Sequence, residues 1–577
     1  MRLAVWAPRA RRVELAVEGD GALPMAAEGG GWHAIASPLL VPGLRYGFRL
    51  DGGPPLPDPR SRLQPEGVDG PSQLIDADFP WQDAGWTAPP LGQAILYELH
   101  VGTFTAEGTF DAAIARLDHL VDLGVTALEL MPVAEFAGGR GWGYDGVDLF
   151  AVRAGYGGPD GLRRLVDACH RRGLAVVIDV VYNHLGPAGN HLAEFGPYFT
   201  DDHRTPWGRA VNLDGAGSDE VRGFVVANAV MWLSDYHADG LRLDAVHALH
   251  DESATHIVEE LAEEVDRLEE RLGRRLWLIL ETERNDPRAV RPRSLGGWGA
   301  DAHWADDFHH AVHTALTGEA HGYYVDYRGI SDLATALRSP YVYRGQHSPW
   351  LRHRRGRDPG DLSGDHFVVC VQNHDQVGNR ARGDRLSQLV DGARLRAAAL
   401  LLLTSPYVPL LFAGEEWGAS TPFLYFTDHA PDLGRLVTEG RRREFAGQGW
   451  DPESIPDPQA EATFAASRLR WQERDEGDHR ALLDWYRRLT RLRRETADLG
   501  CGNPAATRVR RDPEARWLAA ERGRHIIALN LGVADAVLPA GAGRLHRLLA
   551  TGDARELAGA LRLGPAAAGI WRVEGGP

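Results

Sequence analysis

Four short stretches of the sequence end an apolar run in polar side chains that could do chemistry. The second of them, GLRLDAVH at 240–247, alternates apolar and polar residues, which is typical of a strand that packs one face and works with the other. Arg242 and Asp244 lie two apart and would point the same way, so the Arg could keep the carboxylate ionised. Taken alone, this pair could equally be a structural ion pair at a strand end. The other three stretches are DVVYNH at 179–184, LILETE at 278–283 and VQNHDQ at 371–376.

Three carboxylates in these stretches suit the cleavage of a glycosidic bond. That reaction needs one ionised carboxylate at the anomeric centre and one carboxylic acid that stays protonated near neutral pH. Asp244 suits the first task because a neighbouring cation lowers the pKa of a carboxyl group. Glu281 suits the second because it directly follows apolar WLIL, and burial raises the pKa of a carboxyl group. Asp375 could hold sugar hydroxyls while the ring distorts.

The polar residues beside these carboxylates have less specific predictions. His184 and His374 are placed to hydrogen-bond sugar hydroxyls, although a core histidine bonded to backbone is the alternative for each. Asp179 could act in the site or only brace Arg242 or a loop. No HxH or HExxH spacing occurs and the three cysteines are isolated, so we predict no metal site and no cofactor.

The elements that would carry these residues form an alternating pattern from residue 95 onward. Apolar strands alternate there with amphipathic helices, which predicts a (β/α)8 TIM barrel, an α/β fold with polar strand ends that converge on one pocket. Near-continuous apolar strands are expected when a parallel sheet is covered on both faces. The predicted strands lie at 95–105, 125–133, 174–184, 240–247, 277–283, 303–308, 366–376 and 408–418, with helices at 111–123, 159–172, 219–237 and 253–272.

The regions on either side of the predicted barrel have a different sequence pattern. Residues 1–90 consist mainly of short alternating segments between Gly and Pro clusters, which predicts an N-terminal β-sandwich domain. This region includes a Pro-rich connector, 51–73, that is too poor in apolar residues to form an element. The barrel domain is expected at 91–496, with a short insertion at about 185–217 and a helical extension at 419–496. Short strands return beyond it, so 497–577 is predicted to be a small C-terminal β-domain.

Composition limits the classes of function that remain. The chain has 577 residues, 44% hydrophobic and 25% charged, with a formal charge of -17, which disfavours nucleic acid or an anionic membrane as a partner. It contains no lysine, and this excludes a lysine Schiff base and a P-loop. The longest apolar run, 397–413, is broken by Pro406 and Pro409, and the N-terminus lacks a signal-type apolar core. We expect a cytoplasmic monomer.

Together, the four stretches resemble the four ordered motifs of the α-amylase clan of retaining glycosidases and transglycosylases. The resemblance implies that Asp244 is the nucleophile, Glu281 the general acid/base and Asp375 the stabiliser of the transition state. It also implies that several side chains hold the sugar at the cleavage point. These are Arg242, His184, His374 and Tyr144, the last in GWGYDGVDLF (141–150) beside Asp145.

Three further stretches are similar to the maltooligosyltrehalose trehalohydrolase family within that clan: 56–76, 281–288 and 304–327. The resemblance implies hydrolysis, with retention, of the α-1,4 bond next to the terminal trehalose of maltooligosyltrehalose, with related α-glucans as further ligands. Retention would place the two carboxyl groups about 5–5.5 Å apart. Aromatic and carboxylate side chains suit the trehalose side, although Trp304 and Phe308 could equally be barrel packing. The candidates are His247, Glu283, Trp304, Asp307 and Phe308.

Two alternatives remain open at this point. An α-1,4-glucan branching enzyme or an isoamylase-type debranching enzyme would use the same carboxylates. A non-catalytic glycan-binding protein on the same fold is the alternative from another class, since barrels host many functions. The intact set of Asp244, Glu281 and Asp375 favours an enzyme.

Overall fold

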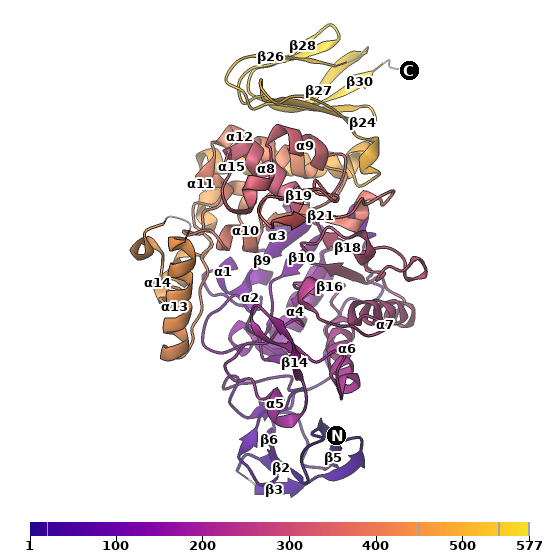
Figure 1. Cartoon of the computed structure of the whole chain (residues 1–577), viewed down its shortest axis with the longest axis vertical. Helices are drawn as coiled ribbons and strands as arrows, with labels where there is room; N and C mark the ends of the chain where they lie inside the picture. The colour runs from indigo at the N-terminus through magenta and orange to yellow at the C-terminus, as the bar shows by residue number, and fades with distance from the viewer. Residues whose placement is uncertain (20, 448–449, 541–542, 575–577) are drawn as a thin grey trace.

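The computed structural model describes residues 1–577 except 20, 448–449, 541–542 and 575–577. Residue 20 belongs to the predicted N-terminal domain, 448–449 to the predicted helical extension, and 541–542 and 575–577 to the predicted C-terminal domain. These parts of the three predictions lie outside the described residues. Figure 1 shows an elongated molecule with the N-terminal strands at one end, the C-terminal strands at the other and the barrel between them. The domain boundaries themselves remain a prediction.

Eight parallel strands close into a barrel, which confirms the predicted fold class. Seven of them fall within the ranges predicted from the sequence, and the strand at Ala302–Trp304 begins one residue before its predicted range of 303–308. Each strand pairs in parallel with its two neighbours. In chain order the strands are β9 (Leu96–Leu99), β10 (Ala127–Leu130), β13 (Ala175–Val180), β16 (Gly240–Leu243), β17 (Trp277–Leu280), β18 (Ala302–Trp304), β21 (Phe367–Cys370) and β22 (Val408–Phe412).

The barrel strands are continuous apolar runs because both of their faces are buried. Inside the barrel, small and branched side chains such as Ala127, Val177 and Ile279 form one cluster with Trp277. On the outside, the strands pack against helices in the large core of the molecule. Every residue of β16 and of β17 is buried. A parallel sheet covered on both faces requires this pattern.

Helices cover the outside of the barrel (Figure 1). α4 has a proline in its first turn, and α7 is capped by the side chain of His256 and ends at Gly273 in the left-handed conformation. The predicted helix at 111–123 is instead two helices, since α2 packs on α4 and α3 packs on α15. The helices are α2 (Phe110–Ile114), α3 (Leu117–Leu123), α4 (Gly158–His170), α6 (Ser218–Ser234), α7 (Ile257–Leu272), α8 (Asp306–Thr317), α9 (Ile330–Ala336), α12 (Gly392–Leu403) and α15 (Gly477–Glu495).

The N-terminal region consists of antiparallel sheets, as predicted. One sheet has the order β1-β5-β4 and the other β3-β2-β6-β7. The Pro-rich connector was wrongly predicted to form no element, because β6 has a free edge on which two short pieces of it, β7 and β8, pair. The strands are β1 (Arg2–Trp6), β2 (Val13–Val17), β3 (Gly21–Pro24), β4 (Ala26–Gly29), β5 (Trp32–Ala36), β6 (Arg45–Leu50), β7 (Pro55–Leu56) and β8 (Ser72–Gln73).

Two segments outside the barrel strands reach the mouth of the barrel. The predicted insertion contains helix α5 (Leu192–Phe195) and the hairpin of β14 (Phe199–Thr205) and β15 (Gly208–Val211). The extension after β22 contains α13 (Pro431–Ala446) and α14 (Glu461–Ala466), which lie together at one side of the molecule in Figure 1.

The C-terminal region forms two antiparallel sheets, with orders β23-β24-β25-β30-β27 and β26-β29-β28. Its strands are β23 (Arg508–Asp512), β24 (Trp517–Arg522), β25 (His525–Asn530), β26 (Ala536–Pro539), β27 (Arg544–Thr551), β28 (Ala554–Leu557), β29 (Ala560–Leu563) and β30 (Ala568–Glu574). Among the helices of the described ranges, none combines the length and the apolar character needed to cross a membrane.

Candidate active site

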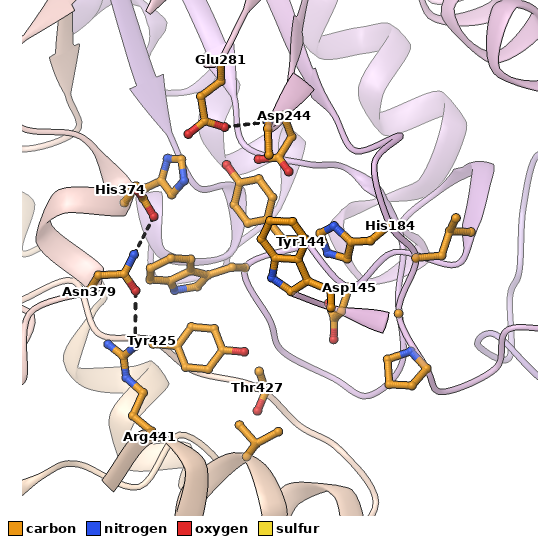
Figure 2. A pocket seen from close by; sticks show the side chains of 18 of the residues that line it. Tyr144, Asp145, His184, Asp244, Glu281, His374, Asn379, Tyr425, Thr427 and Arg441 are labelled. Carbon is orange, nitrogen blue, oxygen red and sulfur yellow. Dashed lines mark hydrogen bonds between the residues drawn. The ribbon is translucent and has the colours of Figure 1, made fainter. Parts of the chain in front are cut away.

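A cavity of about 670 Å³ opens where the barrel strands end (Figure 2). This volume lies within the range of about 300–1,000 Å³ that is usual for small-molecule sites. The carboxyl ends of parallel barrel strands are where such folds carry their active sites. The residues that line it include Trp142, Tyr144, Asp145, His184, Trp207, Asp244, His247, Glu281, Glu283, Asp306, His374, Asp375, Asn379, Tyr425, Thr427, His429, Leu433, Val437, Arg441 and Glu444.

The three predicted catalytic carboxylates all lie on this cavity. Asp244 follows β16, Glu281 follows β17, and Asp375 lies in the short helix α10 (His374–Gly378) after β21. Ala245 takes the left-handed conformation, with φ 40°, and its N–H donates to Glu281 Oε2 at 2.9 Å. A strained non-glycine residue next to a reacting group is a common feature of active sites.

Arg242 contacts both Asp244 and Glu281. Its side chain is fully buried, and Nη1 donates to Asp244 Oδ1 at 2.9 Å while Nη2 lies 2.7 Å from Glu281 Oε2. Nη1 also donates to both oxygens of Asp179 at 2.8 Å, so Asp179 braces Arg242, one of its two predicted roles. The guanidinium carbon lies 4.2 Å from the centre of the Trp304 ring. These contacts fix the Arg242 guanidinium in one position.

The environments of Asp244 and Glu281 shift their pKa values in opposite directions. Burial alone would raise the pKa of Asp244, but Arg242, His184 and a hydrogen bond from Asn183 together hold it below its usual range. Burial raises the pKa of Glu281 well above its usual range, against the opposing effect of Arg242, and the charge of Asp244 adds to the rise. One carboxyl group is therefore kept ionised and its neighbour protonated.

Tyr144 and His374 form a stacked pair at the floor of the cavity. Their ring centres are 5.0 Å apart with planes 23° apart, and the Tyr144 hydroxyl donates to Asp179 Oδ2 at 2.6 Å. Burial alone would lower the pKa of His374, but a hydrogen bond to Glu98 raises it above the usual value. Both side chains are held by buried carboxylates, and each presents an edge or face to the cavity (Figure 2).

His184 lines the cavity near Asp244. Its Nδ1 bonds to the Asn183 side chain, and its ring stacks on Trp207 at 4.5 Å between centres. Burial lowers the pKa of His184, so the ring is neutral near pH 7. Asn183 donates to the Asp244 carboxylate at 2.7 Å. His184 thus lies on the cavity with its Nδ1 engaged by the Asn183 side chain.

Three more predicted binding residues lie on the wall of the cavity. His247 and Glu283 follow the same strands as Asp244 and Glu281. Asp145 faces His429, with 3.6 Å between the carboxylate oxygen and the ring nitrogen, and burial raises its pKa. Their position allows the predicted contacts with sugar hydroxyls.

Four other predicted binding residues do not line the cavity, and the expectation of a direct substrate contact is corrected for them. Arg242 is fully buried beneath the carboxylates that it contacts. Trp304 is buried against Arg242. Asp307 is fully buried and accepts from Asn285 at 2.9 Å and from the Tyr327 hydroxyl at 2.6 Å. Phe308 is fully buried in the core. Because α8 begins at Asp306, the chain turns there and only Asp306 of this segment reaches the cavity.

Sequence reasoning missed several lining residues, among them Trp207 and a group on one helix. Trp207 lies between β14 and β15 and is half exposed. The group on the helix lies after β22, where α13 turns one face to the cavity, with Leu433, Val437, Arg441 and Glu444 three or four residues apart. That spacing was the available signal, since such residues share a helix face. In the described ranges, no cluster of three or more His, Cys, Asp or Glu groups is arranged to hold a metal ion.

The barrel and its paired carboxylates define a glycosidase of the α-amylase type. The model for the alpha amylase catalytic domain matches residues 80–198, and a domain of unknown function, DUF3459, matches residues 503–570. Among solved structures, a candidate alpha amylase from Salmonella typhimurium superposes with a TM-score of 0.91 at 39% identity, covering 99% of this chain and 97% of that one. A pullulanase from Paenibacillus barengoltzii, at 18% identity and a TM-score of 0.74 over 99% and 92% of the two chains, shares the fold.

Relatives that match most or all of the chain show which family within this class of glycosidases it belongs to. The malto-oligosyltrehalose trehalohydrolase of Rhizobium sp. (strain M-11) is 48% identical over 99% of this chain and 97% of its own. Those of Arthrobacter ramosus and Saccharolobus solfataricus are 48% and 46% identical, over 99% and 85% of this chain and 100% and 84% of theirs. The chain belongs to the malto-oligosyltrehalose trehalohydrolase family.

Proposed function

We propose that this protein hydrolyses the α-1,4 bond between a maltooligosaccharide and its terminal trehalose, and so releases trehalose. The relatives that match the whole chain carry this activity in their name, malto-oligosyltrehalose trehalohydrolase. A branching enzyme from Xanthomonas euvesicatoria is 34% identical over only 43% of this chain. Full-length similarity therefore favours the trehalohydrolase over the branching enzyme.

The single observation that carries the chemistry is the position of Arg242 between two carboxyl groups with opposite pKa shifts. Arg242 contacts both Asp244 and Glu281, and the first has a lowered and the second a raised pKa. This is the division of labour that a retaining glycosidase needs.

In the proposed first step, the Asp244 carboxylate attacks the anomeric carbon and the bond to the leaving oxygen breaks. Glu281 gives its proton to that oxygen, so the trehalose leaves as an alcohol and a covalent glycosyl ester remains on Asp244. In the second step, Glu281 takes a proton from water, and the resulting hydroxide equivalent displaces Asp244 from the anomeric carbon with overall retention. The charges of the free enzyme are then restored.

The remaining groups of the cavity would hold the sugar during these steps. Asp375 would accept hydrogen bonds from hydroxyls of the ring that distorts, and His184 and His374 would donate to neighbouring hydroxyls. The Tyr144 ring would lie against the apolar face of the same sugar. On the trehalose side, His247 and Glu283 are the proposed contacts.

The test is a comparison of products from maltotriosyltrehalose and from maltopentaose, each incubated with the same amount of protein. Trehalose released from the first substrate, with the second cut at least about tenfold more slowly, is the expected result. Equal random cleavage of both would indicate a general amylase. New α-1,6 linkages from amylose would indicate branching instead. The cytoplasmic location and the monomeric state stay predictions.

A further inference from the structure

Asp375 is connected to a helix that lies outside the eight-stranded barrel. Its Oδ1 accepts a hydrogen bond from Asn379 Nδ2 at 2.6 Å. The other end of the Asn379 amide, Oδ1, accepts from Arg441 Nη1 at 3.3 Å, and Arg441 belongs to α13. Figure 2 shows Asn379 between its two hydrogen bonds, with Arg441 at the lower end. Asn379 and Arg441 lie more than sixty residues apart in the sequence.

The carboxylate of Asp375 needs such a contact because its backbone contacts do not orient it. Asn373 Oδ1 accepts from the backbone N–H of Asp375 at 3.0 Å, which places the main chain at the start of α10. The side chain itself faces the cavity and is only partly buried. A carboxylate that must meet a distorting sugar ring has to be held within about 0.5 Å of its working position.

Arg441 determines which end of the Asn379 amide faces Asp375. A guanidinium can only donate, so it selects the amide oxygen and turns the amide nitrogen toward the carboxylate. Arg441 is itself held, since it also donates to the backbone oxygen of Gly378 and lies 5.0 Å and 4.9 Å from the ring centres of Tyr425 and Phe445. The orientation of the hydrogen bond from Asn379 to Asp375 thus depends on the hydrogen bond from Arg441 to Asn379.

We propose that Asn379 and Arg441 are positioning residues that hold the Asp375 carboxylate for the reaction, so that α13 contributes to catalysis without touching the reacting atoms. The inference rests on the proposed role of Asp375 in glycoside hydrolysis. It makes the extension after the barrel part of the catalytic machinery.

A misplaced Asp375 would also change the behaviour of Glu281. The charge of Asp375 is one of the groups that raise the pKa of Glu281, after burial and the nearer Asp244. If Asp375 turned away, the pKa of Glu281 would fall, and the acid would lose its proton at lower pH. The alkaline limb of activity would then move to lower pH.

The test measures kcat, KM and the pH profile of the full-length chain with maltotriosyltrehalose for Asn379→Ala and Arg441→Ala. We expect kcat to fall about tenfold for the first and about threefold to tenfold for the second, with KM changed less than about twofold, since one charge-assisted hydrogen bond is lost. The alkaline limb should move to lower pH in both. Arg441→Lys, which keeps a donor, should recover part of kcat. The double variant should be no slower than Asn379→Ala.

Two parallel variants separate the possible failures. Arg443→Ala changes an exposed arginine of the same helix and should leave kcat, KM and the pH profile unchanged. Asp375→Asn should nearly abolish hydrolysis; normal activity there would overturn the proposed function itself. If Asp375→Asn is inactive while Asn379→Ala keeps its kcat and pH profile, the positioning role alone is overturned. A higher KM at unchanged kcat would also overturn it, because that indicates direct sugar binding.

Discussion

The two ends of the barrel each hold a cluster of buried ionisable side chains that contact one another. At the carboxyl end, Arg242 is shared by Asp179, Asp244 and Glu281 beside the cavity. At the amino end, His170 lies between two carboxylates, 2.9 Å from Asp83 and 2.9 Å from Asp239.

The clusters differ in what remains accessible. The side chains of Asp244 and Glu281 keep 11% and 18% of their surface exposed, on the cavity, whereas those of His170 and Asp239 keep 0%. Trp86 stacks over His170 with ring centres 4.8 Å apart and donates to Asp239 at 2.8 Å. A shifted pKa therefore indicates function only where a reactant can reach the group. At the amino end it indicates a structural contact between the segment just before the barrel, which carries Asp83 and Trp86, and the barrel itself.

The largest expected effect comes from Asp244→Asn. Loss of the proposed nucleophile should lower kcat/KM for maltotriosyltrehalose by a factor of about 10⁴ or more, because no covalent intermediate can form. The variant should stay folded, as circular dichroism would show. Asp83→Asn makes the same change at the other end of the barrel and is the matched control, with activity within about twofold of the wild type at 25 °C. Comparable losses from both variants would break the distinction between the two ends.

Glu281→Gln should have the next largest effect. Removal of the acid should lower kcat by about 10³, within the usual range for a general acid. The pKa of Glu281 is raised, so the wild-type acid stays protonated above the usual range and activity falls as pH rises through that pKa. The variant should lose this alkaline limb. A maltosyl fluoride, whose leaving group needs no proton, should be cleaved with less than about a tenfold loss; an equal loss on both substrates would assign the acid elsewhere.

At the amino end, His170→Ala should reduce stability and not catalysis. The variant removes the group between Asp83 and Asp239, which keep their contacts with His237 and Arg274, and this should cost about 1–3 kcal/mol. Thermal unfolding should show this as a lower midpoint, while kcat/KM at 25 °C stays within about twofold. A folded variant with strongly reduced kcat/KM at 25 °C would contradict the assignment.

The pH dependence of this contribution has a defined sign. Burial alone would lower the pKa of His170, but Asp239 and Asp83 raise it above the usual value. The stabilisation is therefore fully present below the unfolded pKa of about 6.5 and is lost as pH rises through the folded pKa. The difference in thermal unfolding midpoint between the wild type and His170→Ala should therefore become smaller as the pH rises.

The barrel and the position of the three cavity carboxylates could be predicted from the sequence because both depend on local patterns. Apolar runs such as WLIL mark strands buried on both faces, and a polar residue directly after such a run, as Glu281, must lie at the strand end. The four strand ends were therefore enough to bring Asp244, Glu281 and Asp375 together on one cavity.

The wall of the cavity could not be predicted in the same way, because it depends on the turns between elements and on packing between distant segments. Asp306 and Asp307 are neighbours in one acidic pair, yet the turn into α8 sends only the first to the cavity. Leu433 and Arg441 mark a helix face, but a helix face by itself does not tell which surface covers it.

The smallest expected effect is at Glu129, which lies on β10 inside the barrel and tests whether burial alone makes a group functional. Its side chain is buried, no described residue bonds to either of its oxygens, and its partner across the β9–β10 register is Glu98. Burial and the charge of Glu98 raise the pKa of Glu129 well above its usual range, against the opposing effect of Arg242, so the group is neutral in the folded protein.

Glu129→Gln should therefore keep kcat/KM within about threefold and, below about pH 4.3, the free energy of unfolding within about 1 kcal/mol. Because the raised pKa makes the native state bind a proton that the unfolded state releases, wild-type stability must fall as pH rises above about 4.3 toward the folded pKa. The glutamine variant lacks this loss and should become the more stable protein at pH 8, as denaturant unfolding at both pH values would measure; a variant that lost activity while folded would show that Glu129 belongs with the catalytic end after all.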